Sequence, residues 1–247
     1  MLISSFKTTR EVFLDPWGLP SALRWENYVE AWNSANIGEG VLNSMLLVGV
    51  SGVATIILAA PAAYALSRFG NRGSSTLTVI FVLGLGVPAQ AIFIPLYIAF
   101  DRLGLINSLT SLQLIYTGTG LPFAVFLLTA FFRTLPRDIE EAAVIDGAST
   151  WYTYSRIMLP LARSGIITVF MLQAIGHWGE TFFALMVLQD KHTISLALLE
   201  FMKAMQYTGA RWSVLFAGLS LVVLPLIVLY VWLGSRIVEG IAAGYGK

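Results

Sequence analysis

The sequence predicts an all-α membrane protein, a polytopic bundle of transmembrane helices. Hydrophobic residues make up 57% of its 247 residues and charged residues only 12%, with a mean hydropathy of +0.76, whereas soluble domains carry about 25% charged residues. Helices are expected because lipid cannot satisfy free backbone amides, and the apolar runs lack the period-two alternation of barrel strands. Five runs are each long enough for the roughly 20 helical residues that cross a bilayer; they lie near residues 41–66, 76–100, 109–132, 164–188 and 213–234.

Taken in chain order, four of these five runs contain proline and only the fourth has none. A proline removes one helical hydrogen bond and bends the helix that contains it. Kinks within membrane helices are therefore expected at Pro61, Pro88, Pro95, Pro122 and Pro225.

The composition also excludes several classes of function. A formal net charge of +1 gives no basic surplus for binding nucleic acid, and the absence of cysteine excludes disulfides, thiolate catalysis and Cys-ligated metals. The two histidines, His177 and His192, lie far apart and form no HExxH motif, so we expect no metal site. No internal repeat interrupts the chain, which predicts a single membrane domain over residues 1–247.

Basic residues beside the spans predict the orientation, because short cytoplasmic loops are enriched in Lys and Arg. Three segments qualify as cytoplasmic, and they contain Arg68, Arg72, Arg133, Arg137, Arg156, Arg163, Arg236 and Lys247. Five spans with a cytoplasmic C-terminus place residues 1–40 outside, although these residues have no export signal. We therefore expect six spans, in which "MLISSF" is the outer end of a first helix whose remainder was lost through a late start codon or truncation.

The charged segment 137–160, "RDIEEAAVIDGASTWYTYSRIMLP", lies in the predicted cytoplasmic loop between the third and fourth runs. Asp138 has the capping-box spacing to the glutamate three residues later, and Gly147 can end that helix in a left-handed turn. Ser149 or Thr150 can cap a second helix, which Pro160 stops. The segment is predicted to form two short helices that meet at Gly147.

The first of these helices has a face suited to docking. Ile139, Ala142, Ala143 and Asp146 fall on one side at helical spacing, and the alanines would let another surface approach the backbone closely. The alternative is an interfacial helix that rests on lipid headgroups.

Two glutamates of this helix, Glu140 and Glu141, lie three and four residues from Arg137. One of them is expected to pair locally with Arg137, which leaves the other available to a partner.

The same loop resembles the signature of a known family. Its residues match the EAA-x3-G-x9-I-x-LP pattern of the membrane subunits of ABC importers at Glu141, Ala142, Ala143, Gly147, Ile157, Leu159 and Pro160. Further segments, among them "LRWENYVEAW", "IPLYIAFDRLGLINS" and "EGIAAGYGK", are similar to the second permease of carbohydrate importers, the MalG-like type, over nearly the whole chain.

The resemblance implies an ATP-driven importer of a sugar or oligosaccharide in the cytoplasmic (inner) membrane of a bacterium or archaeon. It implies that 137–160 is a coupling loop, with Glu140 and Asp146 beside the signature residues, and that it docks on a cytoplasmic ABC ATPase dimer. It also implies a second, different permease subunit and an extracytoplasmic solute-binding protein. The chain has no GxxxxGK[ST] loop, so ATP and Mg would be bound by the partner ATPase, and this chain would be no enzyme.

The fourth run carries candidates for a substrate path. Gln173, His177 and Glu180 fall at i, i+4 and i+7, with Trp178 beside them. Amide, carboxylate and aromatic groups at membrane depth suit a sugar, whose hydroxyls need hydrogen bonds and whose apolar faces stack on rings. The alternatives are that the stripe joins this subunit to its neighbour, or that Glu180 reaches the outer headgroups.

Other functions have less support in the sequence. An ion-coupled secondary transporter would need a charge near the midplane and often a repeated half, and Glu180 is the only candidate charge. A membrane enzyme would need a motif such as GxSxG or HExxH, and neither occurs. The segments 1–40 and 189–211, which the topology places outside, are expected to form the docking surface for the binding protein.

Overall fold

The computed structural model describes residues 1–34, 36–69, 72–208 and 211–245, and over these residues the chain is helical without a strand. The all-α prediction is therefore confirmed. Of the basic residues used for orientation, Lys247 lies outside this range, as do the side chains of Arg72 and Arg236.

Among the described residues, three helices are long and apolar enough to cross a membrane. They are α4 (Ile37–Arg68), α7 (Leu109–Thr134) and the part of α14 (Trp212–Tyr245) that ends at Val231. These helices correspond to the first, third and fifth predicted runs. Each contains one proline and continues through it.

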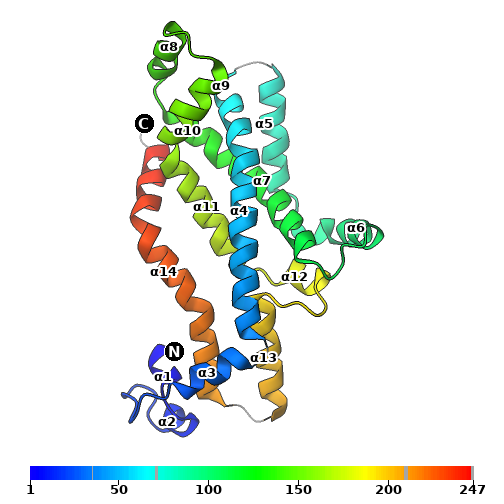
Figure 1. Ribbon diagram of the computed structural model, residues 1–247, viewed down its shortest axis with the longest axis vertical. Coiled ribbons are helices and arrows are strands. Elements are labelled where there is room, and N and C mark those ends of the chain that lie inside the picture. The colour runs from blue at the N-terminus through cyan, green and yellow to red at the C-terminus, as the bar shows by residue number, and fades with distance from the viewer. Residues whose placement is uncertain (35, 70–71, 209–210, 246–247) are drawn as a thin grey trace. The chain divides into compact units, whose positions relative to one another are not determined.

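The second predicted run does not form one continuous helix, so this part of the prediction is wrong. It divides into α5 (Arg72–Leu85) and α6 (Ala89–Arg102), and α6 runs across the direction of α5 (Figure 1). The break falls at Gly86, Val87 and Pro88. Pro88 disfavours helical backbone in the residue before it and has no N–H to donate, so the helix ends here.

The fourth predicted run is also divided. Its first part is α11 (Arg163–Trp178), and its second part is the short α12 (Phe182–Val187). Together with the helical segment Thr150–Leu161, from which it is bent by 69°, α11 is long enough to count as a fourth candidate span.

The chain folds into two compact units. Unit 1 contains residues 1–48, 100–112 and 176–230, and unit 2 contains residues 49–99, 113–175 and 231–247. The divisions fall within α4, α6, α7, α11 and α14.

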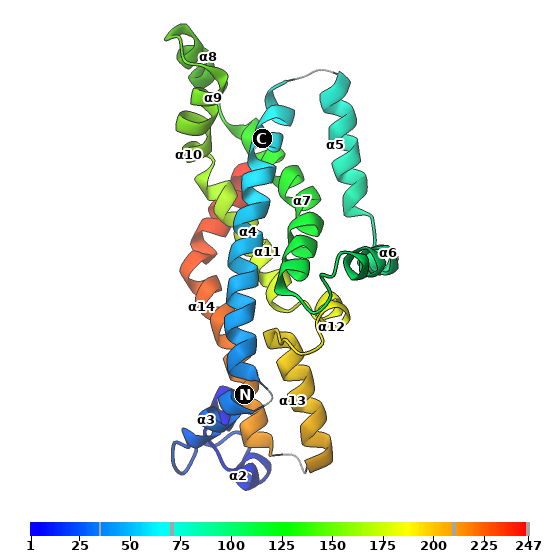
Figure 2. The same cartoon turned by 45° about the vertical axis from the view of Figure 1, so that its right-hand side comes forward.

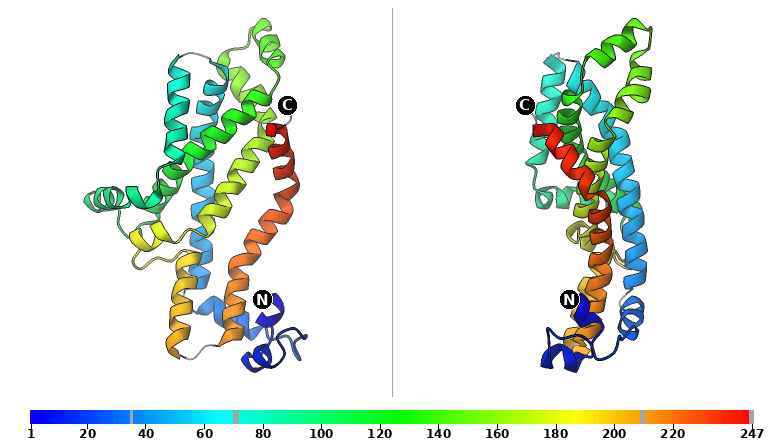
Figure 3. Two further views of the ribbon diagram at one scale, coloured as in Figure 1. Left: turned by 180° about the vertical axis from the view of Figure 1, so that it is seen from behind. Right: turned by 90° about the vertical axis from the view of Figure 1, so that its left-hand side faces the viewer.

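Unit 2 is organised around close contacts among α4, α7 and α11. Its buried side chains include small residues such as Ala59, Ala60 and Ala63, which let helix backbones approach closely in a membrane protein. Larger side chains of the same core include Leu128, Phe132, Met158 and Val169. At Gly165 of α11 an added methyl group would lie 2.5 Å from the ring of Phe131 in α7. Figure 3 shows α7 and α11 side by side in its left view.

Unit 1 contains the short helices α1 (Leu2–Ser5), α2 (Thr9–Leu14) and α3 (Glu26–Asn33), together with α12, α13 (Ile194–Thr208) and most of α14. Its core includes Ile37, Trp178 and Phe201.

The chain just before α13 is fixed to the start of α4 in the same unit. The Ser44 hydroxyl accepts the N–H of Ile194 at 2.9 Å, and the Asn43 amide donates to the carbonyl of His192 at 2.9 Å. His192 lies between two carboxylates, with Nε2 at 2.9 Å from Glu200 and Nδ1 at 3.9 Å from Glu39. Polar side chains therefore hold this loop on α4.

The contact at Gly165 gives a direct test of packing in unit 2. We expect Gly165→Ala to lower the free energy of unfolding by about 1–3 kcal/mol, because the added methyl group overlaps the buried Phe131 ring. The matched control is Gly176→Ala on the same helix, where nothing lies within 4 Å of the added methyl group. Thermal unfolding of the purified protein in detergent compares the two, and equal stabilities would contradict the contact.

Candidate functional site

The first helix of the charged loop is α8 (Asp138–Ile145), and it ends as the sequence predicts. Gly147 has a left-handed backbone with φ of 79°, which residues other than glycine rarely adopt. The N–H of Gly147 bonds to the carbonyl of Val144 at 3.0 Å, and that of Ala148 bonds to the carbonyl of Ala143 at 2.9 Å. This pair of bonds is the Schellman motif, and it satisfies carbonyls that the helix end would leave free.

The start of α8 differs from the prediction. Arg137, not Asp138, is the N-cap residue, and no side chain accepts a hydrogen bond there, so the predicted capping box is wrong. Asp138, Glu140 and Glu141 instead occupy the first turn. Negative charge in that position favours the helix because the N-terminal end of the helix dipole is positive.

The second part of the loop is one bent helical path. Ser149, one of the two predicted candidates, caps α9 (Thr150–Tyr152) by accepting the N–H of Tyr152 at 3.2 Å. A π-helical segment η1 (Thr153–Met158) and α10 (Leu159–Leu161) follow. Pro160 lies within α10, so the helix ends at Leu161, one residue after the proline that was predicted to stop it. Because Pro160 has no N–H, one helical hydrogen bond is missing next to the irregular turns of η1. Figure 2 shows α8 at one end of unit 2, with α9 and α10 leading from it to α11.

The residues predicted to form one docking face do not all point the same way. Ala142 and Asp146 are exposed and Ile139 is 36% exposed, but Ala143 is buried. The inward turn of Ala143 follows from its place on the side of α8 that meets the rest of unit 2. Ala143 therefore belongs to the packed side of the helix.

Several exposed apolar residues of this loop were not among the predicted site residues. Ile145 is 85% exposed, Trp151 70%, Val144 66% and Tyr152 55%. The sequence could have indicated them, because large apolar residues are unexpected in a short charged loop that has no hydrophobic core of its own. They give the outer surface of the loop an apolar character beside Glu141 and Asp146.

Glu140 is paired with a residue 72 positions earlier in the chain. Its Oε1 lies 2.5 Å from Nε of Arg68, and both side chains are largely buried, with 16% and 7% exposed. Its Oε2 accepts a hydrogen bond from the Tyr64 hydroxyl at 3.0 Å. Of the two glutamates, Glu140 therefore pairs with Arg68, and the expected pairing with Arg137 stays a prediction for Glu141.

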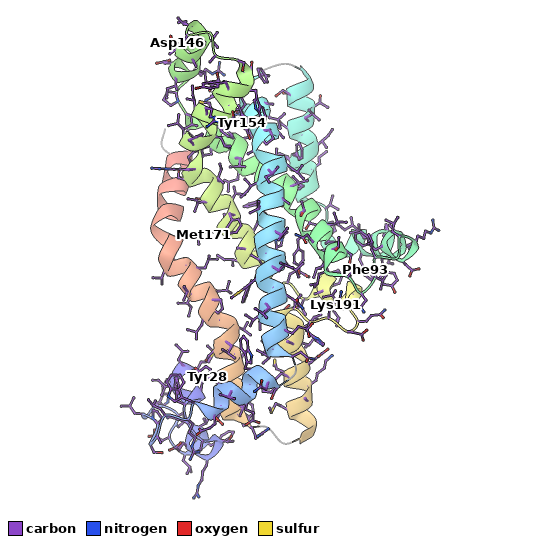
Figure 4. The ribbon with its side chains drawn as sticks, viewed as in Figure 1. Tyr28, Phe93, Asp146, Tyr154, Met171 and Lys191 are labelled. Atoms are coloured by element: carbon purple, nitrogen blue, oxygen red, sulfur yellow. The ribbon has the colours of Figure 1, made fainter. Side chains whose placement is uncertain are left out.

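Aromatic rings pack on Tyr64, which contacts this ion pair through its hydroxyl. Tyr64 packs edge-on against Phe132 with ring centroids 5.6 Å apart, and lies 5.2 Å from the ring of Tyr154. Figure 4 labels Tyr154 beside α4, and Asp146 at the outer end of the loop. The rings exclude water from one side of the pair, which strengthens its electrostatic attraction.

The signature residues therefore divide into two sets. Ile157 and Leu159 are partly buried and pack on the core of unit 2, and Ala143 is buried. Exposed positions are Glu141, Ala142, Gly147 and Pro160.

The predicted polar stripe is shorter than expected, because α11 ends at Trp178 and Glu180 lies beyond it. Within unit 2, Gln173 is buried, and its Nε2 donates to the carbonyl of Gly120 in α7 at 3.1 Å. This bond joins α11 to α7.

The remaining stripe residues lie in unit 1. The Trp178 ring is 5% exposed, and its Nε1 donates to the carbonyl of Val222 at 2.9 Å. The Glu180 carboxylate accepts the N–H groups of Phe183 at 2.8 Å and Ala184 at 3.2 Å at the start of α12. His177 is half-buried near the end of α11. Trp178 and Glu180 therefore both have structural partners within the chain.

Comparison with known proteins places the chain in a family. Residues 52–241 match the model described as "Binding-protein-dependent transport system inner membrane component". The chain is 35% identical over 246 residues to the diacetylchitobiose uptake system permease protein NgcG of Streptomyces coelicolor, covering 99% of this chain and 81% of that relative. It is 30% identical to the probable starch degradation products transport system permease protein AmyC of Thermoanaerobacterium thermosulfurigenes, covering 100% and 89%.

Solved structures share the fold. A chain of a bacterial ABC transporter involved in the import of the acidic polysaccharide alginate superimposes with a TM-score of 0.76 at 21% identity, over 95% of this chain and 87% of that one. A chain of the MetNI methionine ABC transporter in an inward-facing conformation gives a TM-score of 0.61 at 19% identity, over 83% and 95%. Because the family model matches most of the chain and a relative is 35% identical over 99% of it, the chain belongs to the binding-protein-dependent transport system inner membrane components, the permease subunits of ABC importers.

Proposed function

We propose that this permease carries a sugar or oligosaccharide inward across the cytoplasmic membrane of a bacterium or archaeon, and that segment 137–160 couples it to a separate ATPase dimer. The observation that carries the proposal is α8, a short helix with one side packed on unit 2 and the other side exposed. The substrate class is supported by the names of relatives that take up diacetylchitobiose and starch degradation products.

The character of the exposed surface favours a protein partner over lipid. Its apolar residues, chiefly Ile145 and Trp151, fit a cleft in a folded protein. The first turn of α8 carries three acidic side chains, and the cytoplasmic membrane surface is itself negative, so headgroups would repel it. We therefore favour a coupling helix over a helix that rests on the bilayer.

The proposed cycle uses binding energy rather than covalent chemistry in this chain. ATP and Mg bind the partner ATPase dimer, which closes and moves segment 137–160, and the spans then alternate between outward and inward openings. A second, different permease supplies the other half of the path. The extracytoplasmic solute-binding protein delivers the solute to segments 1–40 and 189–211.

The geometry of Glu180 favours this mechanism over an ion-coupled secondary transporter. A coupling carboxylate must bind and release its ion during transport. Glu180 already accepts two backbone N–H groups that α12 would otherwise leave unsatisfied at its start. Binding an ion there would disrupt the start of that helix.

For the substrate path we favour Gln173 over Trp178 and Glu180, whose polar groups bond to the backbone of unit 1. The buried Oε1 of Gln173 has no hydrogen-bond partner in the described chain, so it can accept a hydroxyl of the solute. We expect Gln173→Ala to reduce uptake at least tenfold, on the order of the 1–3 kcal/mol that an unpaired buried polar group costs, while the ATPase remains bound. Uptake in proteoliposomes and co-purification measure both, and a loss of assembly would instead assign Gln173 to the contact between this subunit and its neighbour.

The backbone of Gly147 tests the coupling loop. We expect Gly147→Val to lose the ATPase in a pull-down from mild detergent, because a β-branched residue at φ of 79° costs about 1–3 kcal/mol and displaces the turn. Gly147→Asn is expected to lose less, since asparagine tolerates this conformation. Gly104→Val is the matched control, because Gly104 has φ of 65° and lies outside the loop. Equal losses at both glycines would argue against coupling through this loop.

The exposed apolar surface has its own test. Ile145→Asp is expected to weaken ATPase binding by about 1–3 kcal/mol, or roughly tenfold to a hundredfold, because it places a charge in an apolar contact. Leu103→Asp is the control, since Leu103 is also well exposed, at 68% against 85%, and lies outside the loop. Titration of the purified ATPase onto the permease complex in nanodiscs measures both affinities. Unchanged binding by Ile145→Asp would remove this surface from the interface.

A further inference from the structure

We propose that Arg68, which lies outside the signature loop, is a positioning residue whose ion pair with Glu140 joins α8 to the end of α4. Motion that reaches α8 would then pass directly to α4. This inference rests on the proposed function, because it takes α8 to be the helix that an ATPase moves.

Packing alone gives α8 little attachment to the rest of unit 2. Of its eight residues, only Ala143 is buried, and Glu140 is half-buried. A helix with one small buried side chain contributes little apolar area to the unit. The polar contacts of Glu140 are therefore the main side-chain attachment of α8.

These contacts involve both oxygens of the Glu140 carboxylate. Oε1 faces Nε of Arg68 at 2.5 Å, and Oε2 accepts the Tyr64 hydroxyl at 3.0 Å. Arg68 is the last residue of α4, and Tyr64 lies one turn before it. Two successive turns of α4 thus hold one residue of α8, which restricts rotation as well as translation of α8 on α4.

Arg68 also reaches a third segment. Its Nη2 donates to the carbonyl of Leu135 at 3.0 Å, one residue beyond the end of α7. The guanidinium therefore connects the ends of α4 and α7 to α8. Lysine could not replace it, because a single ammonium lacks the fixed, planar set of donors that makes these two contacts together.

Burial makes the ion pair between Arg68 and Glu140 persistent. The two charged side chains are 7% and 16% exposed, and separating them would leave each charge with little solvent to compensate it. A surface pair would instead exchange readily with water and salt. We therefore infer that α8 and the end of α4 stay together through the transport cycle.

The absence of cysteine allows a direct measurement. Spin labels at Ile57→Cys on α4 and Asp138→Cys on α8 occupy exposed positions within unit 2, outside the apolar surface proposed to bind the ATPase. In the assembled transporter in nanodiscs, the distance between the labels is expected to stay the same with and without ATP. Arg68→Gln is expected to broaden the distribution of that distance. If the distance changes on ATP binding in the labelled protein that keeps Arg68, the inference is overturned, whatever the stability of Arg68→Gln.

A functional measurement accompanies the distance. We expect Arg68→Gln and Arg68→Lys to lower the solute transported per ATP hydrolysed by about tenfold while the ATPase stays bound. Arg102→Gln is the control, since Arg102 is an exposed arginine on α6 and takes no part in the contacts between Arg68 and Glu140. An unchanged ratio in both Arg68 variants would overturn the inference. Failure of the proposed function is distinct, because then no ATPase would co-purify even with the unaltered chain.

Discussion

The rest of the structure depends on one constraint, which is that hydrocarbon offers no hydrogen-bond partner to the peptide backbone. The chain meets it with long helices whose prolines are tolerated within α4, α7 and α14. Because lipid gives no hydrophobic reason for helices to associate, close packing has to hold them together. The contact of Gly165 with Phe131 and the burial of alanines in α4 supply that packing in unit 2.

Polar groups then serve as connections at chosen points. Gln173 joins α11 to α7, Ser44 and Asn43 hold the chain before α13, and Glu140 is held by Arg68. Each is largely shielded from solvent or bonded to backbone, where a lost partner costs more than at the surface. Together they explain how a protein with so few charged residues holds its helices and loops in place.

The local part of the candidate site could be predicted from sequence, and its long-range part could not. Gly147 and Ser149 act on neighbours within four residues, so turn and capping preferences were enough to place them. The partner of Glu140 is 72 positions away in another helix, and no local spacing indicates it. The same limit applies to Ala143, whose burial depends on what α8 packs against rather than on its own helical period.

The sequence by itself determined the all-α membrane class, the places of three spans and the turn at Gly147, because hydropathy, chain length and backbone conformation are properties of short segments. Only the tertiary structure decided where the second run breaks, which side of α8 is buried and which charge Glu140 meets. Those outcomes depend on which helices come together. That choice is made by packing between segments far apart in the chain.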